Sequence, residues 1–350
     1  MRFMSESIRV GVIGFGMAGR IFHTAVIAET PGLELACIVQ RKGDEAAQAY
    51  PGVKIARCIE EMLDDESIPL IVVATPSGDH YAHAAQCLKA KRNVVVDKPF
   101  TLTSEEAREL IDLAKGNGVL LTAYQNRRWD GDSVTMKQVV ESGELGRIVT
   151  YEAHIDRYRG APRLHAWREN GGAGGGILFD IGAHLIDQAA MLFGDPDSVW
   201  ADVRMERDGS VIDDAFDVQL KFGSVTALLR STLTAVTPGP RFTIHGTKGS
   251  FVKHGIDPQE DALKAGGKYS DPGFGEDVES QWGELQIAGE SPRKIRTARG
   301  DYRGLYANVR DALLGTGKLE VTAEQAWRTT RIIELCRESA ASGCRVKYPG

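Results

Sequence analysis

The chain has 350 residues, 42% of them hydrophobic and 26% charged, and its formal net charge is −6. This length suits two domains with buried cores, and the acidic balance argues against nucleic acid or an anionic membrane surface as the main partner. No apolar run reaches the roughly eighteen residues that span a membrane, and an odd number of cysteines without metal-ligand spacing suits a reducing compartment. The sequence therefore predicts a soluble, cytoplasmic protein that acts on a small molecule and holds no metal.

The first third of the chain alternates short apolar runs with helical patterns, which is typical of βαβ units and a parallel sheet. We expect strands at residues 9–13, 34–39, 70–74, 93–96 and 119–123, a weaker strand near Lys54, and helices at 19–28, 78–90 and 104–117. The pattern predicts an α/β Rossmann domain over residues 1–125.

A glycine-rich turn follows the first predicted strand and opens the first helix. In a βαβ unit, the first glycine of such a turn permits a tight bend, the second lets the backbone approach a pyrophosphate, and the third allows close packing of helix and strand. The alternative is a purely structural glycine turn, but the complete βαβ context favours dinucleotide binding. The residues are Gly14, Phe15, Gly16, Met17, Ala18 and Gly19.

The end of the second predicted strand bears on the choice of cofactor. An acidic residue there would accept hydrogen bonds from the ribose 2′-hydroxyl of NAD, but this chain has Gln40, Arg41 and Lys42 instead. A guanidinium can pair with a 2′-phosphate, so we predict cofactor contacts at Gln40 and Arg41 and a preference for NADP, with NAD as the second possibility. The alternative is that Arg41 and Lys42 are solvated loop charges.

Two later strands end in polar turns at the same edge of the predicted sheet. Ligands of open α/β sheets bind at this carboxyl edge, so Thr75, Pro76 and His80 are expected to line the nicotinamide half of the cofactor, unless they form only a helix cap. Lys98 follows the next strand, and an ammonium group there can polarise an oxygen atom. Taken alone, Lys98 is more often an exposed lysine than a catalytic one.

After residue 124 the βαβ rhythm gives way to long strand-like runs, which indicates a second domain over residues 126–350. We predict an α+β fold with a large, mainly antiparallel open sheet that helices cover on one side. The strands are expected at 148–155, 198–207, 216–222, 225–234 and 241–245, and the helices at 130–142, 181–192, 304–314 and 323–339.

One helix of the second domain follows a run of glycines and carries Asp180, His184 and Asp187 at helical spacing. Side chains three and four residues apart share a helix face, so a carboxylate there can fix the tautomer of His184 and support its positive form. The spacing predicts a histidine that handles protons. An amphipathic helix with one structural histidine is the alternative.

The motifs GFGMAG, ATPSGDH, DKP and GGGILFDIGAHLID follow one another along nearly the whole chain. In this combination the chain resembles the Gfo/Idh/MocA family of nicotinamide-dependent oxidoreductases. The segments YQNRRWDGD, YEAHIDRYR, HLIDQA and GPRFTIHGTKGSF are similar to the branch that contains NADP-dependent scyllo-inositol dehydrogenases. The resemblance also implies a homodimer or homotetramer.

Matching the motifs residue by residue carries the family's roles onto this chain. Lys98, Asp180 and His184 match its catalytic group, which lies at the cleft between the domains. Asp97 stands where glutamate is commoner, and the resemblance implies that it accepts a hydrogen bond from a ribose hydroxyl. Besides the glycine turn, cofactor contacts are implied for Thr75, Pro76, Asp97, Lys98, Trp167 and Arg168.

The implied reaction is hydride transfer between nicotinamide and the secondary alcohol or ketone of a cyclic polyol, such as scyllo-inositol and its inosose. In the oxidation, His184 accepts the alcohol proton, Lys98 stabilises negative charge on the same oxygen, and Asp180 supports His184. Substrate contacts are predicted for these three residues and for Arg157, Tyr158 and His165, with a solvated loop as the alternative for the last three.

Other functions fit parts of the same pattern. An aldose 1-dehydrogenase or a keto- or anhydro-sugar reductase would use the same three catalytic residues, since loops read the hydroxyl pattern. A non-catalytic dinucleotide-binding sensor is an alternative of another class, against which the joint presence of Lys98, Asp180 and His184 argues. A glycosidase with NAD as internal redox cofactor would need a metal or a different base.

Overall fold

The computed structural model describes residues 7–349, which fold into two compact units. Unit 1 contains the chain as far as Asn126 together with Tyr302–Trp327, and unit 2 contains Arg127–Asp301 and the chain from Arg328 onward. The sequence prediction ended the first domain at residue 125 and placed everything after it in the second. The structure adds Tyr302–Trp327 to the first unit. Within residues 7–349, no helix is both long and apolar enough to cross a membrane.

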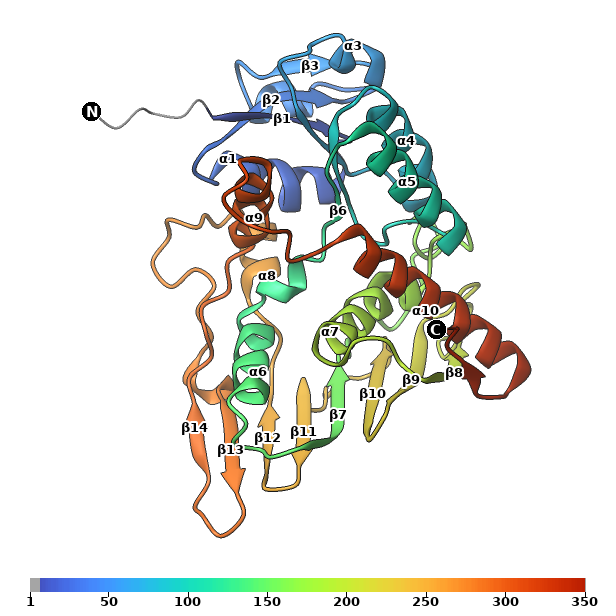
Figure 1. The fold of residues 1–350 in the computed structure, drawn as a ribbon, viewed down its shortest axis with the longest axis vertical. Helices are drawn as coiled ribbons and strands as arrows, with labels where there is room; N and C mark the ends of the chain where they lie inside the picture. The colour runs from blue at the N-terminus through green and yellow to red at the C-terminus, as the bar shows by residue number, and fades with distance from the viewer. Residues whose placement is uncertain (1–6, 350) are drawn as a thin grey trace. The chain divides into compact units, whose positions relative to one another are not determined.

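Unit 1 contains a six-stranded sheet in the order β3-β2-β1-β4-β5-β6, and all of its strand pairs are parallel (Figure 1). Every residue of Leu70–Val73 in β4 is buried, as expected for a strand that is covered on both faces. The predicted Rossmann fold is confirmed. The strands are β1 (Ile8–Ile13), β2 (Leu33–Val39), β3 (Lys54–Ala56), β4 (Leu70–Val73), β5 (Asn93–Val96) and β6 (Leu121–Ala123).

The strand order reverses at β1, which pairs with β2 on one side and with β4 on the other. Ligands of open α/β sheets bind at the carboxyl ends of the strands at such a switch point. The helical elements of this unit are a π-helical turn (Gly19–Thr24), α1 (Ala25–Ala28), α2 (Glu45–Ala49), α3 (Ile59–Leu63), a short 3₁₀ turn (Ser77–Asp79), α4 (His80–Lys89), α5 (Ser104–Asn117) and α9 (Arg303–Leu313).

Helix α9 joins unit 1 through side chains that are far from it in the sequence. Its Tyr306 is fully buried, and the Tyr306 hydroxyl lies 2.6 Å from Nδ1 of His23. After α9, the carbonyl of Val321 accepts a hydrogen bond from Thr122 Oγ1 at 2.6 Å. Leu305 and Val309 add an apolar stripe one turn apart. This packing explains why the segment belongs to the first unit.

Unit 2 contains a nine-stranded sheet in the order β14-β13-β12-β11-β7-β10-β9-β8-β15. Only the central pair β7 and β10 is parallel, which confirms the predicted, mainly antiparallel sheet. The strands are β7 (Ile148–His154), β8 (Ser198–Arg204), β9 (Ala215–Phe222), β10 (Val225–Thr232), β11 (Phe242–Gly246), β12 (Gly249–Lys253), β13 (Gly283–Ile287), β14 (Arg293–Ile295) and β15 (Val346–Lys347).

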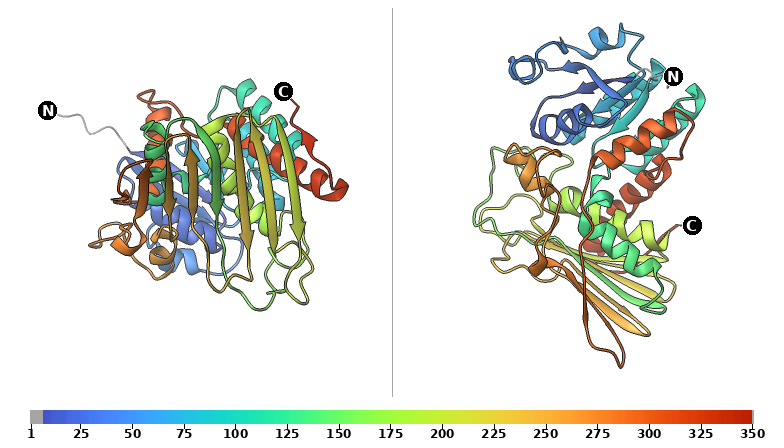
Figure 2. Two further views of the ribbon diagram at one scale, coloured as in Figure 1. Left: turned by 90° about the horizontal axis from the view of Figure 1, so that it is seen from below. Right: turned by 90° about the vertical axis from the view of Figure 1, so that its left-hand side faces the viewer.

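Buried and partly exposed residues alternate along the strands, so one face of this sheet packs on the core. In β9, Phe216, Val218 and Leu220 are buried and the residues between them are not. The helices of unit 2 cover this face (Figure 2). They are α6 (Gly131–Glu141), α7 (Ala183–Phe193) and α10 (Ala323–Ser342). A π-helical turn (Leu178–Gly182) precedes α7, and the first residues of α10 belong to unit 1. The connections contain α8 (Gln259–Lys264) and the 3₁₀ turns Asn126–Trp129 and Glu279–Gln281.

Candidate functional site

The glycine turn after β1 has the backbone that the sequence motif predicts. Gly14 has φ +103°, and a Cβ atom there would lie 2.7 Å from the carbonyl oxygen of Ala74. A Cβ atom at Gly19 would lie 2.1 Å from the carbonyl oxygen of Gly14, whereas one at Gly16 would meet no atom within 4 Å. The outer two glycines are therefore required by packing, and Gly16 leaves open space where a pyrophosphate can approach the backbone. These residues fit a dinucleotide.

The loop after β2 is shaped by polar contacts that leave its cations exposed. The side chain of Gln40 accepts a hydrogen bond from the amide of Ala46 at 2.9 Å and donates to Glu45. Arg57, which the sequence analysis did not single out, donates to the carbonyls of Gln40 and Gly43 at 3.0 and 2.6 Å. Gln40 thus builds the loop, while Arg41 and Lys42 beside it are exposed.

Asp97 lies at the end of β5 and is only 6% exposed. Its Oδ1 accepts a hydrogen bond from the amide of Lys98 at 2.8 Å and lies 3.5 Å from Nε2 of His23, whose Nδ1 contacts the Tyr306 hydroxyl. Burial alone would raise the pKa of Asp97, but His23, then the charges of His80 and Lys98, outweigh it and hold the pKa at about 2. The residue is therefore an ionised acceptor next to Lys98.

The contact between His23 and Asp97 links two parts of the predicted cofactor site within unit 1. His23 lies in the π-helical turn that begins at Gly19, and Asp97 and Lys98 directly follow β5. The glycine turn and the lysine therefore belong to one connected structure. The sequence analysis missed His23 and Tyr306, because they are 283 residues apart and nothing near either one marks the pairing.

In unit 2, the glycine run leads into a π-helical turn that carries Asp180, and His184 follows in the first turn of α7. Asp213 holds the start of this turn, since its Oδ2 accepts from the amide of Leu178 at 2.8 Å. His184 is 3% exposed. Asp180 is partly exposed and lies 3.5 Å from Nε of Arg168, whose guanidinium stacks on Trp167 at 4.4 Å. Local π-helical geometry is frequent at functional sites.

Asp187 differs from its sequence interpretation. We predicted that a carboxylate on this helix face supports His184, but both oxygens of Asp187 accept from Arg128, at 2.7 and 2.6 Å. Both residues are buried. Such a bidentate pair fixes α7 to the segment before α6, so the role of Asp187 is structural. The spacing was read correctly as helical, but it carries no information on a partner 59 residues away.

The predicted substrate contacts lie in the segment between β7 and the glycine run. Tyr158 is 61% exposed and His165 is exposed, while Arg157 lies 3.3 Å from Glu260. The two units thus carry different parts of the predicted site. Unit 1 holds the glycine turn, Gln40, Arg41, Thr75, Pro76, His80, Asp97 and Lys98, and unit 2 holds Arg157, Tyr158, His165, Trp167, Arg168, Asp180 and His184.

The segment that carries these contacts is held by Glu169, which the sequence analysis also missed. Its carboxylate is 2.9 Å from Arg163 and from Arg207, and 3.4 Å from Arg159. Burial alone would raise the pKa of Glu169, but hydrogen bonds from Arg163 and Arg207 outweigh it and lower the pKa to about 2.

Replacing Glu169 with Gln is expected to lower the free energy of unfolding of unit 2 by about 3 kcal/mol at pH 7, because it removes a buried carboxylate that three arginines contact. Arg207 keeps its second partner, Asp214, at 2.9 Å. The folded pKa is depressed, so this stabilisation is fully present above the ordinary carboxyl pKa and is lost as the pH falls towards 2. Urea unfolding at pH 7 and pH 3 measures it. Glu144→Gln, which removes an exposed pair with Arg293, is the control and should cost less than about 1 kcal/mol. Equal losses in both variants would contradict the role of Glu169.

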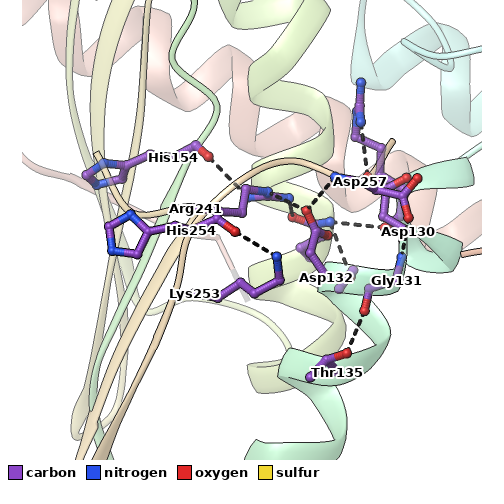
Figure 3. A network of polar contacts seen from close by, with 12 residues as sticks. Asp130, Gly131, Asp132, Thr135, His154, Arg241, Lys253, His254 and Asp257 are labelled. Carbon is purple, nitrogen blue, oxygen red and sulfur yellow. Dashed lines mark hydrogen bonds and ion pairs between the residues drawn. The ribbon is translucent and has the colours of Figure 1, made fainter. Parts of the chain in front are cut away.

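A second buried network lies under the sheet of unit 2 and joins α6 to β11 and the segment after β12 (Figure 3). Arg241 donates to Asp132 at 3.2 Å and to Gln188 at 2.9 Å. Asp257 accepts from the amide of Gly131 at 2.6 Å, and burial, followed by the charge of Asp132, raises its pKa to about 6. Through Arg241 the network joins α6 to α7, the helix that carries His184. In the range 7–349, no group of three or more His, Cys, Asp or Glu side chains could hold a metal ion.

Comparison with known proteins agrees with this geometry. Residues 8–125 match the NAD-binding Rossmann-fold model of the Gfo/Idh/MocA oxidoreductase family, and residues 137–348 match its C-terminal α/β domain. The chain is 41% identical to the uncharacterized oxidoreductase YdgJ of Escherichia coli over 96% of this chain and 97% of that protein. It is 38% identical to the scyllo-inositol 2-dehydrogenase (NADP⁺) IolW of Bacillus subtilis over 96% and 94%. A solved structure of the putative oxidoreductase yvaA from Bacillus subtilis, 36% identical, superimposes with a TM-score of 0.94 and covers 99% of this chain and 100% of that one. This chain therefore belongs to the Gfo/Idh/MocA family of oxidoreductases.

Proposed function

We propose that this protein is an NADP(H)-dependent oxidoreductase that interconverts a secondary alcohol and a ketone on a cyclic polyol, with scyllo-inositol and its inosose as the substrate pair. The observation that carries the proposal is the connected edge of unit 1, where the glycine turn and Lys98 are linked through His23 and Asp97. The similarity to a scyllo-inositol 2-dehydrogenase over nearly the whole chain supports the choice of substrate.

The bound nicotinamide would supply the hydride acceptor or donor. In the proposed oxidation, His184 takes the proton of the alcohol, and the ammonium of Lys98 donates a hydrogen bond to the same oxygen while negative charge develops on it. Asp180 supports the positive charge of His184, and Arg168 beside it keeps that carboxylate anchored. The ionised Asp97 accepts a hydrogen bond from a ribose hydroxyl. In the reduction, His184 returns the proton.

Further residues would contact the cofactor and the substrate. Thr75, Pro76, Trp167 and Arg168 contact the cofactor, and Arg157, Tyr158 and His165 hold hydroxyl groups of the substrate. We propose that the protein works in the cytoplasm as a homodimer or homotetramer, which sedimentation analysis can measure.

The assay is the appearance of reduced nicotinamide by near-ultraviolet absorbance, with NADP and then NAD. The panel consists of scyllo-inositol, myo-inositol, glucose, xylose and galactose. Turnover of scyllo-inositol with NADP supports the proposal. Turnover of aldoses alone would replace the substrate with that of an aldose 1-dehydrogenase, and no turnover of any of them would favour a sensor.

Replacing Arg41 with Ser is expected to weaken NADP binding by about 10- to 100-fold, because it removes a charged hydrogen bond to the 2′-phosphate worth about 1.5–3 kcal/mol. The exposed position of Arg41 in the loop after β2 motivates the change. Dissociation constants from fluorescence titration measure it. NAD is the internal control, since it lacks the phosphate and should bind with unchanged affinity. An equal loss for both cofactors would show that Arg41 shapes the loop instead.

A further inference from the structure

His80 opens α4 and is buried between two turns at the carboxyl edge of the parallel sheet. Its Nδ1 lies 2.8 Å from the carbonyl oxygen of Pro99, in the turn after β5. Its Nε2 lies 3.0 Å from the carbonyl oxygen of Thr75, in the turn after β4. The side chain is only 1% exposed. We predicted that His80 lines the cofactor, and in the structure its buried ring bridges the two turns.

Two carbonyl partners place a strict requirement on the protons of this ring. A carbonyl oxygen only accepts hydrogen bonds, and a neutral imidazole carries a single N–H. With one proton, one of the two contacts of His80 would oppose a nitrogen lone pair to an oxygen lone pair. With two protons, His80 donates to Pro99 and to Thr75 at once. The geometry therefore favours the imidazolium form.

The charged and titratable groups around His80 decide whether a buried cation is tolerated. Burial lowers the pKa of His80, and its place at a helix N-terminus also disfavours a positive charge. The carboxylate of Asp97 acts in the opposite direction and is followed in strength by the two carbonyl contacts, whereas a positive charge on His23 would act against it. Burial is the largest of these influences, and together they lower the pKa of His80. The case for a cation therefore rests on the two carbonyl contacts of its ring. His83 and Lys98 are the other neighbours that interact with this group or with Asp97.

Asp97 supplies the reason for a cation at this place. A buried carboxylate is costly unless a positive charge and hydrogen bonds compensate it. His23 meets Asp97 through Nε2, and the hydroxyl of Tyr306 can donate to its Nδ1, so His23 needs only one proton to satisfy both contacts. His80 has no such solution, since both of its partners are acceptors. The positive charge that compensates Asp97 is therefore best placed on His80, as a second proton on its ring.

We propose that His80 is a buried imidazolium that ties the Thr75 turn to the Lys98–Pro99 turn and thereby positions Lys98. It is a positioning residue, because its ring contacts the backbone of both turns. The effect on turnover rests on the proposed dehydrogenase function, whereas the protonation state and the bridge do not.

The first test is NMR of the ring nitrogens in the full chain labelled with ¹⁵N-histidine, at pH 8 and without ligands. Both ring nitrogens of His80 are expected to carry protons. His83 is the internal contrast on the same helix, because its Nδ1 faces the Thr75 hydroxyl, which can donate or accept, so that no second ring proton is needed. It should show a single ring proton. Assignments come from His80→Gln and His83→Gln. A single ring proton on His80 at pH 8 would overturn the proposal, whatever the activity of the protein.

The second test compares the kinetics of the same two variants. His80→Gln cannot bridge both carbonyls, so kcat for the proposed polyol should fall by about 10²-fold through misplacement of Lys98, while KM changes little. His83→Gln should change kcat by less than about threefold. A folded His80→Gln protein with the kcat of the wild type would overturn the positioning role. If His80→Gln does not fold, the NMR result on the wild type decides the proposal. An inactive wild type with a doubly protonated His80 would contradict the proposed function alone.

Discussion

Replacing Lys98 with Ala is expected to lower kcat for polyol oxidation by about 10²- to 10⁴-fold, because the ammonium no longer stabilises negative charge on the reacting oxygen. The fold of unit 1 should persist, since the hydrogen bond from the backbone amide of Lys98 to Asp97 survives the substitution. Steady-state absorbance assays measure kcat, and circular dichroism with NADPH titration reports folding and cofactor binding.

Lys89→Ala is the matched control for that change. Lys89 lies at the end of α4 in the same unit and is exposed, so its replacement removes the same charge without touching the proposed site. The control should keep the kcat of the wild type within about twofold. A Lys98→Ala protein that is folded, binds NADPH and turns over as fast as the control would refute the assignment of Lys98.

Loss of His184 is expected to have an effect of similar size with a different dependence on pH. His184→Ala should lower kcat about 10²- to 10⁴-fold at pH 7. The loss should shrink at high pH, because hydroxide can then remove the alcohol proton that the imidazole would take. Since His184 is 3% exposed, His184→Asn is made alongside to limit any cavity. The measurement is kcat as a function of pH.

His245→Ala controls for the removal of a histidine from unit 2. His245 lies in β11, is exposed, and its Nδ1 lies 2.8 Å from the hydroxyl of Ser250. Its loss should leave the pH profile unchanged. If the His184 variants lost activity by the same factor at every pH, the side chain would act through binding or structure and not as the proton acceptor.

Features that depend on residues close together in the sequence could be predicted well. The need for glycine at positions 14 and 19 follows from steric rules that act within a few residues, and the structure shows the close packing at both. The parallel and antiparallel sheets also follow from periodicity. The short elements were missed, including α2, α3, α8 and the strands β12 to β15. Several of these are exposed or only a few residues long, as in Arg293–Ile295, so they carry little hydrophobic pattern.

Pairings between distant residues could not be predicted. Arg128 donates hydrogen bonds to both carboxylate oxygens of Asp187, and Arg207 donates to Glu169, which is 38 residues away in the sequence. Tyr306 reaches His23 because α9 returns to unit 1. Each of these pairs depends on tertiary packing, and the residues next to either partner in the sequence do not indicate it. They form the supports that hold the candidate residues in place.

The most direct test of hydride transfer from a cyclic polyol uses scyllo-inositol with deuterium on its ring carbons. The wild-type protein is incubated with this substrate and NADP, and the mass of the reduced cofactor is measured. Hydride transfer from a ring carbon predicts NADPH that carries one deuterium atom from the substrate. Reduced cofactor without the label, or no reduced cofactor at all, would contradict it.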